Sequence, residues 1–190
     1  MPTLLTLPDA SAPEGPVAPH VVLVGLPGAG KTTIGRALAD AVQRPFLDFD
    51  AEIERRTDAT VAEIFASRGE PHFRQLEQDL TREVAAWRGG MILSPGGGWI
   101  TNSGVVAALR PPARMIWLKV RPTEAVRRLG EQAQRRPLLN RMNPTAGLEQ
   151  LLKDREARYA TADLAINTEI FLIPRILERL QMEVAKWDMA

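Results

Sequence analysis

The feature that most constrains this chain is a glycine-rich stretch near its start, GLPGAGKTT at residues 25–33. It fits the pattern G-x-x-x-x-G-K-[ST]. The preceding residues, Val21–Val24, form an apolar run typical of a buried strand, and residues 34–42 have the apolar spacing of a helix. A strand, a glycine loop and a helix in this order are the context that the motif requires. The stretch therefore predicts a P-loop that binds nucleoside triphosphates, rather than a chance glycine-rich turn.

Each residue type in this loop has a physical role in binding phosphate. Gly28 and Gly30 let the backbone approach phosphate oxygens, and successive N–H groups form a nest for the anion. The N-terminus of the following helix adds the positive end of its dipole. Lys31 supplies a charge for the β- and γ-phosphates, and the Thr32 hydroxyl can bind Mg²⁺.

Composition narrows the class of protein further. The chain has 190 residues, of which 45% are hydrophobic, and this suggests a single globular domain with a substantial core. A formal net charge of +1 argues against nucleic acid as the main partner. The chain has no cysteine and only two histidines, so we expect a reducing compartment and no disulfide, thiolate or histidine-rich zinc site. Mg²⁺, which prefers oxygen ligands, is the only metal that we expect.

The N-terminal residues 1–19 differ from the rest of the chain. They contain five prolines but no arginine or lysine, and no apolar pattern follows a basic region. This composition is typical of a disordered tail rather than of a signal or transit peptide. No apolar stretch is long enough to span a membrane. We therefore expect a tail at 1–19, one domain at 20–190, and a cytoplasmic protein.

Apolar runs alternate with helical patterns along the rest of the chain. This alternation predicts a three-layer α/β/α fold with a five-stranded parallel sheet, a P-loop NTPase similar to the nucleoside-monophosphate kinases. The strands are expected at residues 21–24, 46–49, 91–94, 113–120 and 164–167, and the later helices at 122–129, 148–159 and 173–186. Residues 173, 176, 177, 180 and 184 of the last helix are expected to face inward.

Two acidic residues follow the second predicted strand. Asp48 and Asp50 are two positions apart, which would place both carboxylates on one side of that strand, at its carboxyl end. Like charges in this arrangement repel unless a cation or a substrate hydroxyl lies between them. Alternatively, Asp50 only caps the helix predicted at 51–56. Beside a P-loop, the catalytic interpretation is favoured, because ligands bind beyond the carboxyl ends of strands.

Two further stretches are candidates for ligand contact. Arg74 and Glu77 are neighbours at i, i+3 on a predicted helix; they either form a plain surface ion pair or Glu77 fixes Arg74 to bind an anionic group. Gly96, Gly97 and Gly98 follow the third predicted strand. Three consecutive glycines at this position allow a ligand or another backbone segment to approach closely.

A polar, basic stretch interrupts the alternating pattern after residue 129. A lid at about 130–142 is one possible function for a loop of this length. Four arginines lie in or just before it, namely Arg127, Arg128, Arg135 and Arg136. They either form a solvated face or contact phosphates and adenine, and the nucleotide-binding context favours the second possibility.

From about Val21 to Leu180 the chain resembles the shikimate kinase family. Four features in order carry the resemblance: the P-loop GLPGAGKTT, the acid pair in FLDFD, the sequence GEPHFRQLE, and the triple glycine followed by RPLL. The P-loop alone occurs in many unrelated NTPases, but the ordered set is specific. The resemblance implies ATP- and Mg²⁺-dependent phosphorylation of the 3-hydroxyl of shikimate, in the pathway to chorismate and the aromatic amino acids.

The resemblance also implies roles for individual residues. Lys31, Asp50 and Arg136 would be catalytic, with Asp50 as the base. One Mg²⁺ per subunit would be held by Thr32 and Asp48. ATP would be bound by Gly28, Ala29, Gly30, Lys31, Thr32, Thr33, Arg128 and Arg136, and shikimate by Asp50, Arg74, Gly96, Gly97, Gly98 and Arg155. We expect a monomer whose only partners are shikimate and ATP, without nucleic acid or membrane.

Other functions remain open at this point. A small P-loop kinase for gluconate or for nucleotides would share the loop, although Tyr159 is the only tyrosine available to stack on a nucleoside. A GTPase is disfavoured because the chain contains neither N-K-x-D nor D-x-x-G. A kinase-like domain that senses a ligand without turnover is disfavoured by the presence of Lys31, Thr32, Asp48 and Asp50.

Overall fold

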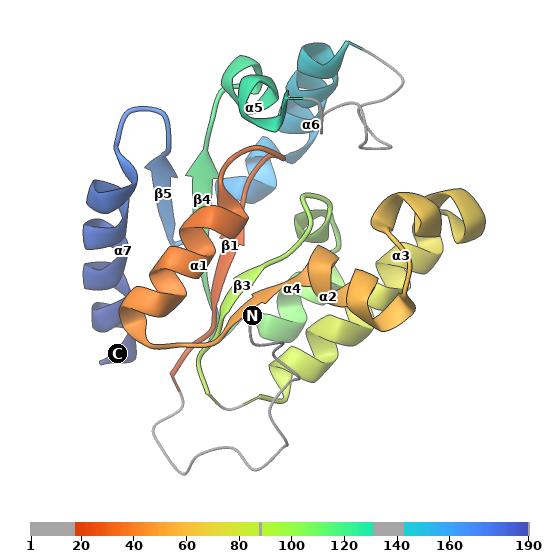
Figure 1. Cartoon of the computed structure of the whole chain (residues 1–190). Helices are drawn as coiled ribbons and strands as arrows, with labels where there is room; N and C mark the ends of the chain where they lie inside the picture. The colour runs from red at the N-terminus through yellow and green to blue at the C-terminus, as the bar shows by residue number, and fades with distance from the viewer. Residues whose placement is uncertain (1–17, 88, 131–142, 190) are drawn as a thin grey trace.

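The computed structural model describes residues 18–87, 89–130 and 143–189. Within this part of the chain, all strands belong to one five-stranded parallel sheet in the order β2-β3-β1-β4-β5 (Figure 1). The strands are β1 (Val21–Val24), β2 (Phe46–Asp48), β3 (Ile92–Ser94), β4 (Arg114–Lys119) and β5 (Leu164–Asn167). The predicted fold class is therefore confirmed.

Helices connect the strands and cover both faces of the sheet (Figure 1). They are α1 (Lys31–Val42), α2 (Phe49–Thr57), α3 (Val61–Ala85), α4 (Ser103–Leu109), α5 (Pro122–Leu129), α6 (Pro144–Tyr159) and α7 (Ile173–Asp188), with a short 3-10 helix, η1 (Trp99–Thr101). Among the described residues, no helix is both long and apolar enough to cross a membrane.

The side chains of β1 show how the sheet divides the core. Val21 and Leu23 pack with α1 and α7 on one face, whereas Val22 and Val24 pack with α3 and α4 on the other. Successive side chains of a strand point to opposite faces, so a strand buried on both sides must be apolar throughout. A polar side chain at any position of β1 would leave the helices on one face of the sheet without an apolar partner. This explains the uninterrupted apolar run.

Helix α3 contains a break at Gly69. Gly69 has φ 79° and ψ 168°, outside the helical region, and Pro71 follows it. A positive φ favours glycine, and proline is tolerated in the first turn of a new helical segment. The segment that begins here carries Arg74 and Glu77.

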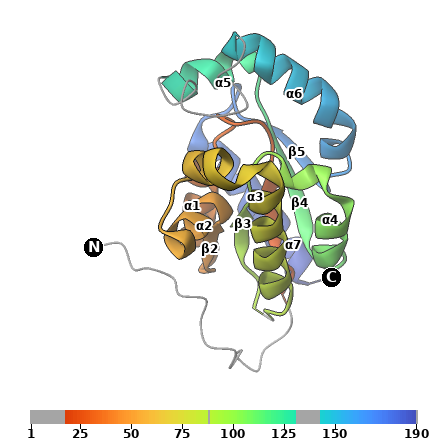
Figure 2. The ribbon, with the colours of Figure 1, turned by 90° about the vertical axis from the view of Figure 1, so that its right-hand side faces the viewer.

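Helices α5 and α6 lie across the end of the sheet at which the P-loop joins β1 to α1 (Figure 2). This is the edge formed by the carboxyl ends of the parallel strands, where ligands bind in open α/β sheets. Most of the predicted tail and of the predicted lid lies outside the described residues.

Two local predictions are wrong. Strand β2 ends at Asp48, and α2 begins at Phe49, so Asp50 lies in the first turn of a helix and not on the strand. The Asp48 side chain, not Asp50, caps this helix by accepting a hydrogen bond from the Ala51 N–H. In α7, Ile173 is exposed rather than inward-facing; it is the first helical residue and continues the exposed run of Ile170, Phe171 and Leu172.

Candidate active site

A cavity of about 210 Å³ lies at the carboxyl edge of the sheet. Four segments that are distant in sequence line it: the P-loop, the acid pair at the end of β2, the glycine turn after β3, and Leu129 at the end of α5. The lining includes nine of the predicted site residues, namely Gly28, Gly30, Lys31, Thr32, Thr33, Asp48, Asp50, Gly96 and Gly97. The structure thus brings the predicted phosphate loop and the predicted acids to one site.

The P-loop is wrapped around the side chain of Lys31. The Lys31 ammonium donates to the carbonyls of Gly25 and Leu26 at 3.0 and 3.1 Å. Gly28 has φ 82°, and a Cβ there would lie 2.5 Å from the Ala125 carbonyl, so this position requires glycine. Ala29 differs from its neighbours: its side chain is in the core, and its N–H donates to Leu26 within the loop.

Thr32 and Asp48 meet beside the cavity. The Thr32 hydroxyl donates to Asp48 Oδ2 at 2.7 Å, which joins the start of α1 to the end of β2. A hydroxyl and a carboxylate oxygen are ligands that suit Mg²⁺. No group of three or more acidic, histidine or cysteine side chains capable of holding a metal occurs among the described residues. The pair therefore fits a Mg²⁺ that takes its other ligands from phosphates and water.

Two arginines lie against the glycine turn. The Arg74 guanidinium packs directly on Gly98, where any Cβ would collide with it. Arg155, from α6, donates from Nη1 to the Gly97 carbonyl at 2.7 Å. Tyr159, one turn further along α6, has its hydroxyl 3.4 Å from the same carbonyl. The absence of side chains at 97 and 98 thus allows both guanidinium groups to approach one turn.

Glu77 lies between Arg74 and Asp50. Its side chain is 2% exposed and accepts a hydrogen bond from Arg74 Nη1 at 2.5 Å. Glu77 Oε1 and Asp50 Oδ1 flank Gly96, since a Cβ there would lie 2.9 Å from each. Burial raises the pKa of Glu77 from 4.5 to about 7; Arg74 opposes this shift, and the carboxylates of Asp50 and Glu70 add to it. The ion pair with Arg74 is therefore buried, not a plain surface pair.

This raised pKa predicts a pH-dependent stability. The folded state binds the Glu77 proton more tightly than the unfolded chain does, so its contribution to stability is complete below about pH 4.5 and is lost as pH rises through about 7. The loss should reach about 3 kcal/mol, at about 1.4 kcal/mol per pKa unit. Burial lowers the pKa of His20, which acts in the opposite direction. The measurement is therefore the difference in free energy of unfolding between the parent protein and Glu77→Gln, by denaturant titration from pH 4.5 to 8.

The exposed Glu149 provides the matched control for this experiment. The difference in free energy of unfolding between the parent protein and Glu149→Gln should stay constant over the same pH range. If the difference for Glu77→Gln is equally constant, Glu77 is ionised throughout and the interpretation is wrong.

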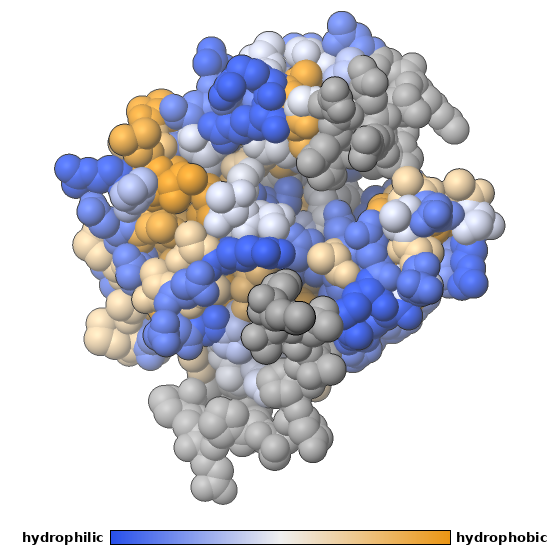
Figure 3. Space-filling view, viewed as in Figure 1, coloured by the Kyte–Doolittle hydropathy of each residue, from blue (hydrophilic) through white to orange (hydrophobic). Residues whose placement is uncertain are grey.

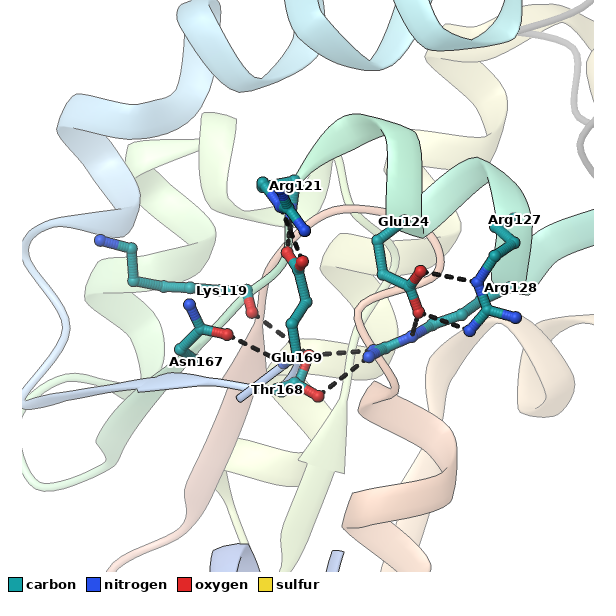
Figure 4. Close-up of polar contacts among 8 residues, drawn as sticks. All are labelled: Lys119, Arg121, Glu124, Arg127, Arg128, Asn167, Thr168 and Glu169. Atoms are coloured by element: carbon teal, nitrogen blue, oxygen red, sulfur yellow. Dashed lines mark hydrogen bonds and ion pairs between the residues drawn. The ribbon is translucent and has the colours of Figure 1, made fainter. Parts of the chain in front are cut away.

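Arg128 lies outside the cavity lining, in a network that joins α5 to the segment after β5 (Figure 4). It donates to Glu124 at 2.8 Å and to the Thr168 hydroxyl and carbonyl at 3.0 and 2.9 Å. Hydrogen bonds from Arg127 and Arg128 lower the pKa of Glu124 to about 2. Glu169 in turn accepts from both the backbone and the side chain of Arg121. Arg128 is thus held in one orientation at the carboxyl edge.

The segment between β5 and α7 exposes several large apolar side chains. Ile170, Phe171, Leu172 and Ile173 are all exposed, and Figure 3 shows an apolar area over this segment. They follow directly after Glu169 of the Arg128 network. An exposed apolar run beside a fixed arginine is suited to cover a flat, partly apolar ligand group.

The structure also shows residues at the site that sequence analysis did not assign to it. Ser94, at the end of β3, lines the cavity, Tyr159 approaches Gly97, and Glu70 contacts Arg74. The spacing of Glu70 and Arg74 at i, i+4 could have indicated an ion pair. Ser94 could have been indicated by its place at the carboxyl end of the third predicted strand, directly before the glycine turn. No local signal could have placed Tyr159 beside Gly97, because it meets the site only through tertiary packing. Arg136 lies outside the described residues.

Comparison with known proteins identifies the family. A P-loop, an acid pair and two arginines at the edge of a five-stranded parallel sheet define the class, an ATP-dependent P-loop kinase. A family model for shikimate kinase matches residues 27–181. Shikimate kinase from Mycobacterium avium (strain 104) is 44% identical over 146 residues, which cover 77% of this chain and 81% of that protein. The chain therefore belongs to the shikimate kinase family.

Solved structures agree with this assignment. The structure of shikimate kinase from Acinetobacter baumannii in complex with shikimate superposes with a TM-score of 0.82 at 35% identity, covering 90% of this chain and 96% of that one. Shikimate kinase from Bacteroides thetaiotaomicron gives a TM-score of 0.77 at 32% identity, with 88% and 98% covered. The predictions of family and enzyme class are confirmed.

Proposed function

We propose that this chain transfers the γ-phosphoryl group of ATP to the 3-hydroxyl of shikimate. One observation supports this proposal above the others. The P-loop and two carboxylates line one small cavity, and the guanidinium groups of Arg74 and Arg155 lie against the glycine turn that closes one side of it. A phosphoryl donor and a small hydroxy acid need these groups. The Acinetobacter relative, which is similar over almost the whole chain, was solved with shikimate bound.

On the donor side, Lys31 and the loop amides bind the phosphates of ATP. Thr32 and Asp48 hold Mg²⁺, which supplies positive charge to the phosphates when bound. Arg128 contacts adenine, and the neighbouring exposed apolar segment covers the base. Arg136 neutralises phosphate charge from a lid at about 130–142, which excludes water as a competing acceptor.

On the acceptor side, Arg74 and Arg155 bind the carboxylate of shikimate against the glycine turn. Glu77 fixes Arg74, and Asp50 accepts the proton of the hydroxyl that attacks. Phosphoryl transfer depends on positioning and charge neutralisation more than on covalent chemistry, so these roles are sufficient. We also propose that residues 20–190 act as one monomeric domain in the cytoplasm, independently of the tail and without nucleic acid or membrane.

A coupled assay of ADP release tests the proposal and separates it from the alternatives. ADP should appear only with shikimate, and the product should be shikimate 3-phosphate. ADP release with gluconate or a nucleoside monophosphate instead would indicate another small-molecule kinase. Shikimate binding without any turnover would indicate a ligand sensor.

Removing either of the two arginines proposed to bind the carboxylate should weaken the binding of shikimate but not the binding of ATP. A charged hydrogen bond contributes roughly 1.5–3 kcal/mol, or about tenfold to a hundredfold in affinity. Arg74→Ala and Arg155→Ala should each raise the Kd for shikimate by this factor, measured by calorimetry, with the Kd for ATP unchanged.

Arg82→Ala is the matched control for these variants, because Arg82 lies on the same helix as Arg74 and pairs with Asp79 at the surface. It should leave both Kd values unchanged. A loss of ATP affinity with intact shikimate binding in either variant would show that the carboxylate site is misassigned.

A further inference from the structure

The hydrogen bonds of Arg74 leave a defined part of its guanidinium group available. Nε and Nη2 both donate to Glu70 Oε1, at 3.1 and 2.7 Å, and Nη1 donates to Glu77 Oε2 at 2.5 Å. A guanidinium group has five N–H donors. These contacts use three of them, leaving one N–H on each terminal nitrogen. Two N–H groups are the number that a bidentate carboxylate requires.

The two acidic partners of Arg74 differ in their surroundings. The Glu77 side chain is 2% exposed, whereas the Glu70 side chain is 47% exposed and reaches Arg74 from the solvent side. Glu70 immediately follows the break at Gly69, so it stands at the start of the second segment of α3, four residues before Arg74. A glutamate at a helix N-terminus is favoured by the helix dipole.

Arg74 is confined on its remaining sides as well. Its guanidinium group packs on the Gly98 backbone, and Cζ lies 5.5 Å from the centre of the Phe73 ring. Among these contacts, only the one with Glu70 restrains the Nε edge. Without it, Arg74 would keep its charge and its bond to Glu77 but could rotate the two remaining N–H groups away from the site.

We propose that Glu70 is a positioning residue for acceptor binding, which holds the Nε edge of Arg74 so that its two remaining N–H groups face the carboxylate of the acceptor. This inference rests on the proposed role of Arg74. The opposite possibility is that Glu70 competes with the acceptor carboxylate. The donor count favours positioning, because a carboxylate can accept from the remaining N–H groups without displacing Glu70.

Three variants at or near this position test the inference in steady-state assays. Glu70→Ala should raise KM for shikimate about twofold to fivefold, the size expected for a partly exposed ion pair. KM for ATP and kcat should be unchanged. Glu70→Gln should stay close to the parent protein, because both bonds end on a single oxygen that the amide can supply. Asp79→Ala is the control, since Asp79 pairs with Arg82 on the same helix and both side chains are exposed.

Each contrary result has a distinct meaning. A lower KM for shikimate in Glu70→Ala would identify Glu70 as a competitor and overturn the inference. Equal effects of Glu70→Ala and Glu70→Gln, an unchanged KM in Glu70→Ala, or a parallel rise in KM for ATP would overturn it too. Failure of the proposed function would appear differently, as a parent protein that does not phosphorylate shikimate.

Discussion

Replacing Lys31 with alanine should reduce shikimate-dependent turnover by at least about 10²–10³-fold, the effect of removing one group that stabilises charge in a transition state. The Lys31 ammonium lies at the cavity and donates to two loop carbonyls, so it is already held in the phosphate-binding loop before ATP arrives. Alanine leaves the strand, the loop glycines and the helix in place but removes this charge. The measurement is ADP release at saturating shikimate and Mg²⁺.

The fold should survive this substitution. Lys31 belongs to the first turn of α1 and contributes nothing to the buried face of that helix. Its loss should change Tm by no more than about 4 °C, which corresponds to about 1 kcal/mol in a protein of this size. Lys186→Ala, at an exposed ion pair in α7, is the control and should keep full activity. Near-normal turnover in Lys31→Ala would refute the role of the loop.

Local patterns predicted most of the fold. A strand buried on both faces must be apolar at every position, and a helix covering such a sheet must be apolar on one side. Both patterns can be read from neighbouring residues, and β5 and α5 have the predicted bounds. Strand order could not be predicted in this way, because β1 pairs with β3 and β4 through contacts that no local pattern records.

The prediction for Asp50 illustrates a second limit. FLDFD has the alternation of a strand, and a period of two would place both carboxylates on one side. In the structure, the Asp48 side chain accepts a hydrogen bond from the Ala51 N–H and caps a helix that begins at Phe49. Asp50 therefore lines the cavity from the first turn of this helix and not from a strand. The juxtaposition of the two acids was predicted correctly, but the reason given for it was wrong.

The candidate site was predictable to the extent that its residues belong to short motifs. The P-loop, the acid pair and the triple glycine each lie within one segment, and the structure places them around one cavity. Tyr159 and Thr168 act through packing across 40 to 62 positions of sequence, so nothing near them in the chain marks them. Glu70 is an intermediate case. Its spacing from Arg74 can be seen in the sequence and indicates an ion pair, but its proposed positioning role depends on the second contact of Arg74, with Glu77.

The acid pair can be separated experimentally into a metal role and an acceptor role. Asp48→Asn keeps the shape of the helix cap but removes the charge beside Thr32, and asparagine caps helices as well as aspartate does. This variant should raise the Mg²⁺ concentration needed for half-maximal activity, and excess Mg²⁺ should restore part of the rate. Asp40→Asn, at an exposed position of α1, should leave the Mg²⁺ requirement unchanged.

Asp50→Asn should behave differently, because no added cation can replace a missing proton acceptor. Loss of a general base lowers the rate typically about 10²–10⁴-fold, and this deficit should persist at every Mg²⁺ concentration. Shikimate should also bind more weakly, since an amide is a poorer hydrogen-bond acceptor than a carboxylate for its hydroxyls. The measurement is a Mg²⁺ titration of shikimate-dependent ADP release for both variants. Full rescue of Asp50→Asn by Mg²⁺, with Asp48→Asn insensitive to Mg²⁺, would mean that the two roles are assigned the wrong way round. Asp50, in the first turn of α2, would then bind the metal, and Asp48, at the end of β2, would act on the acceptor hydroxyl.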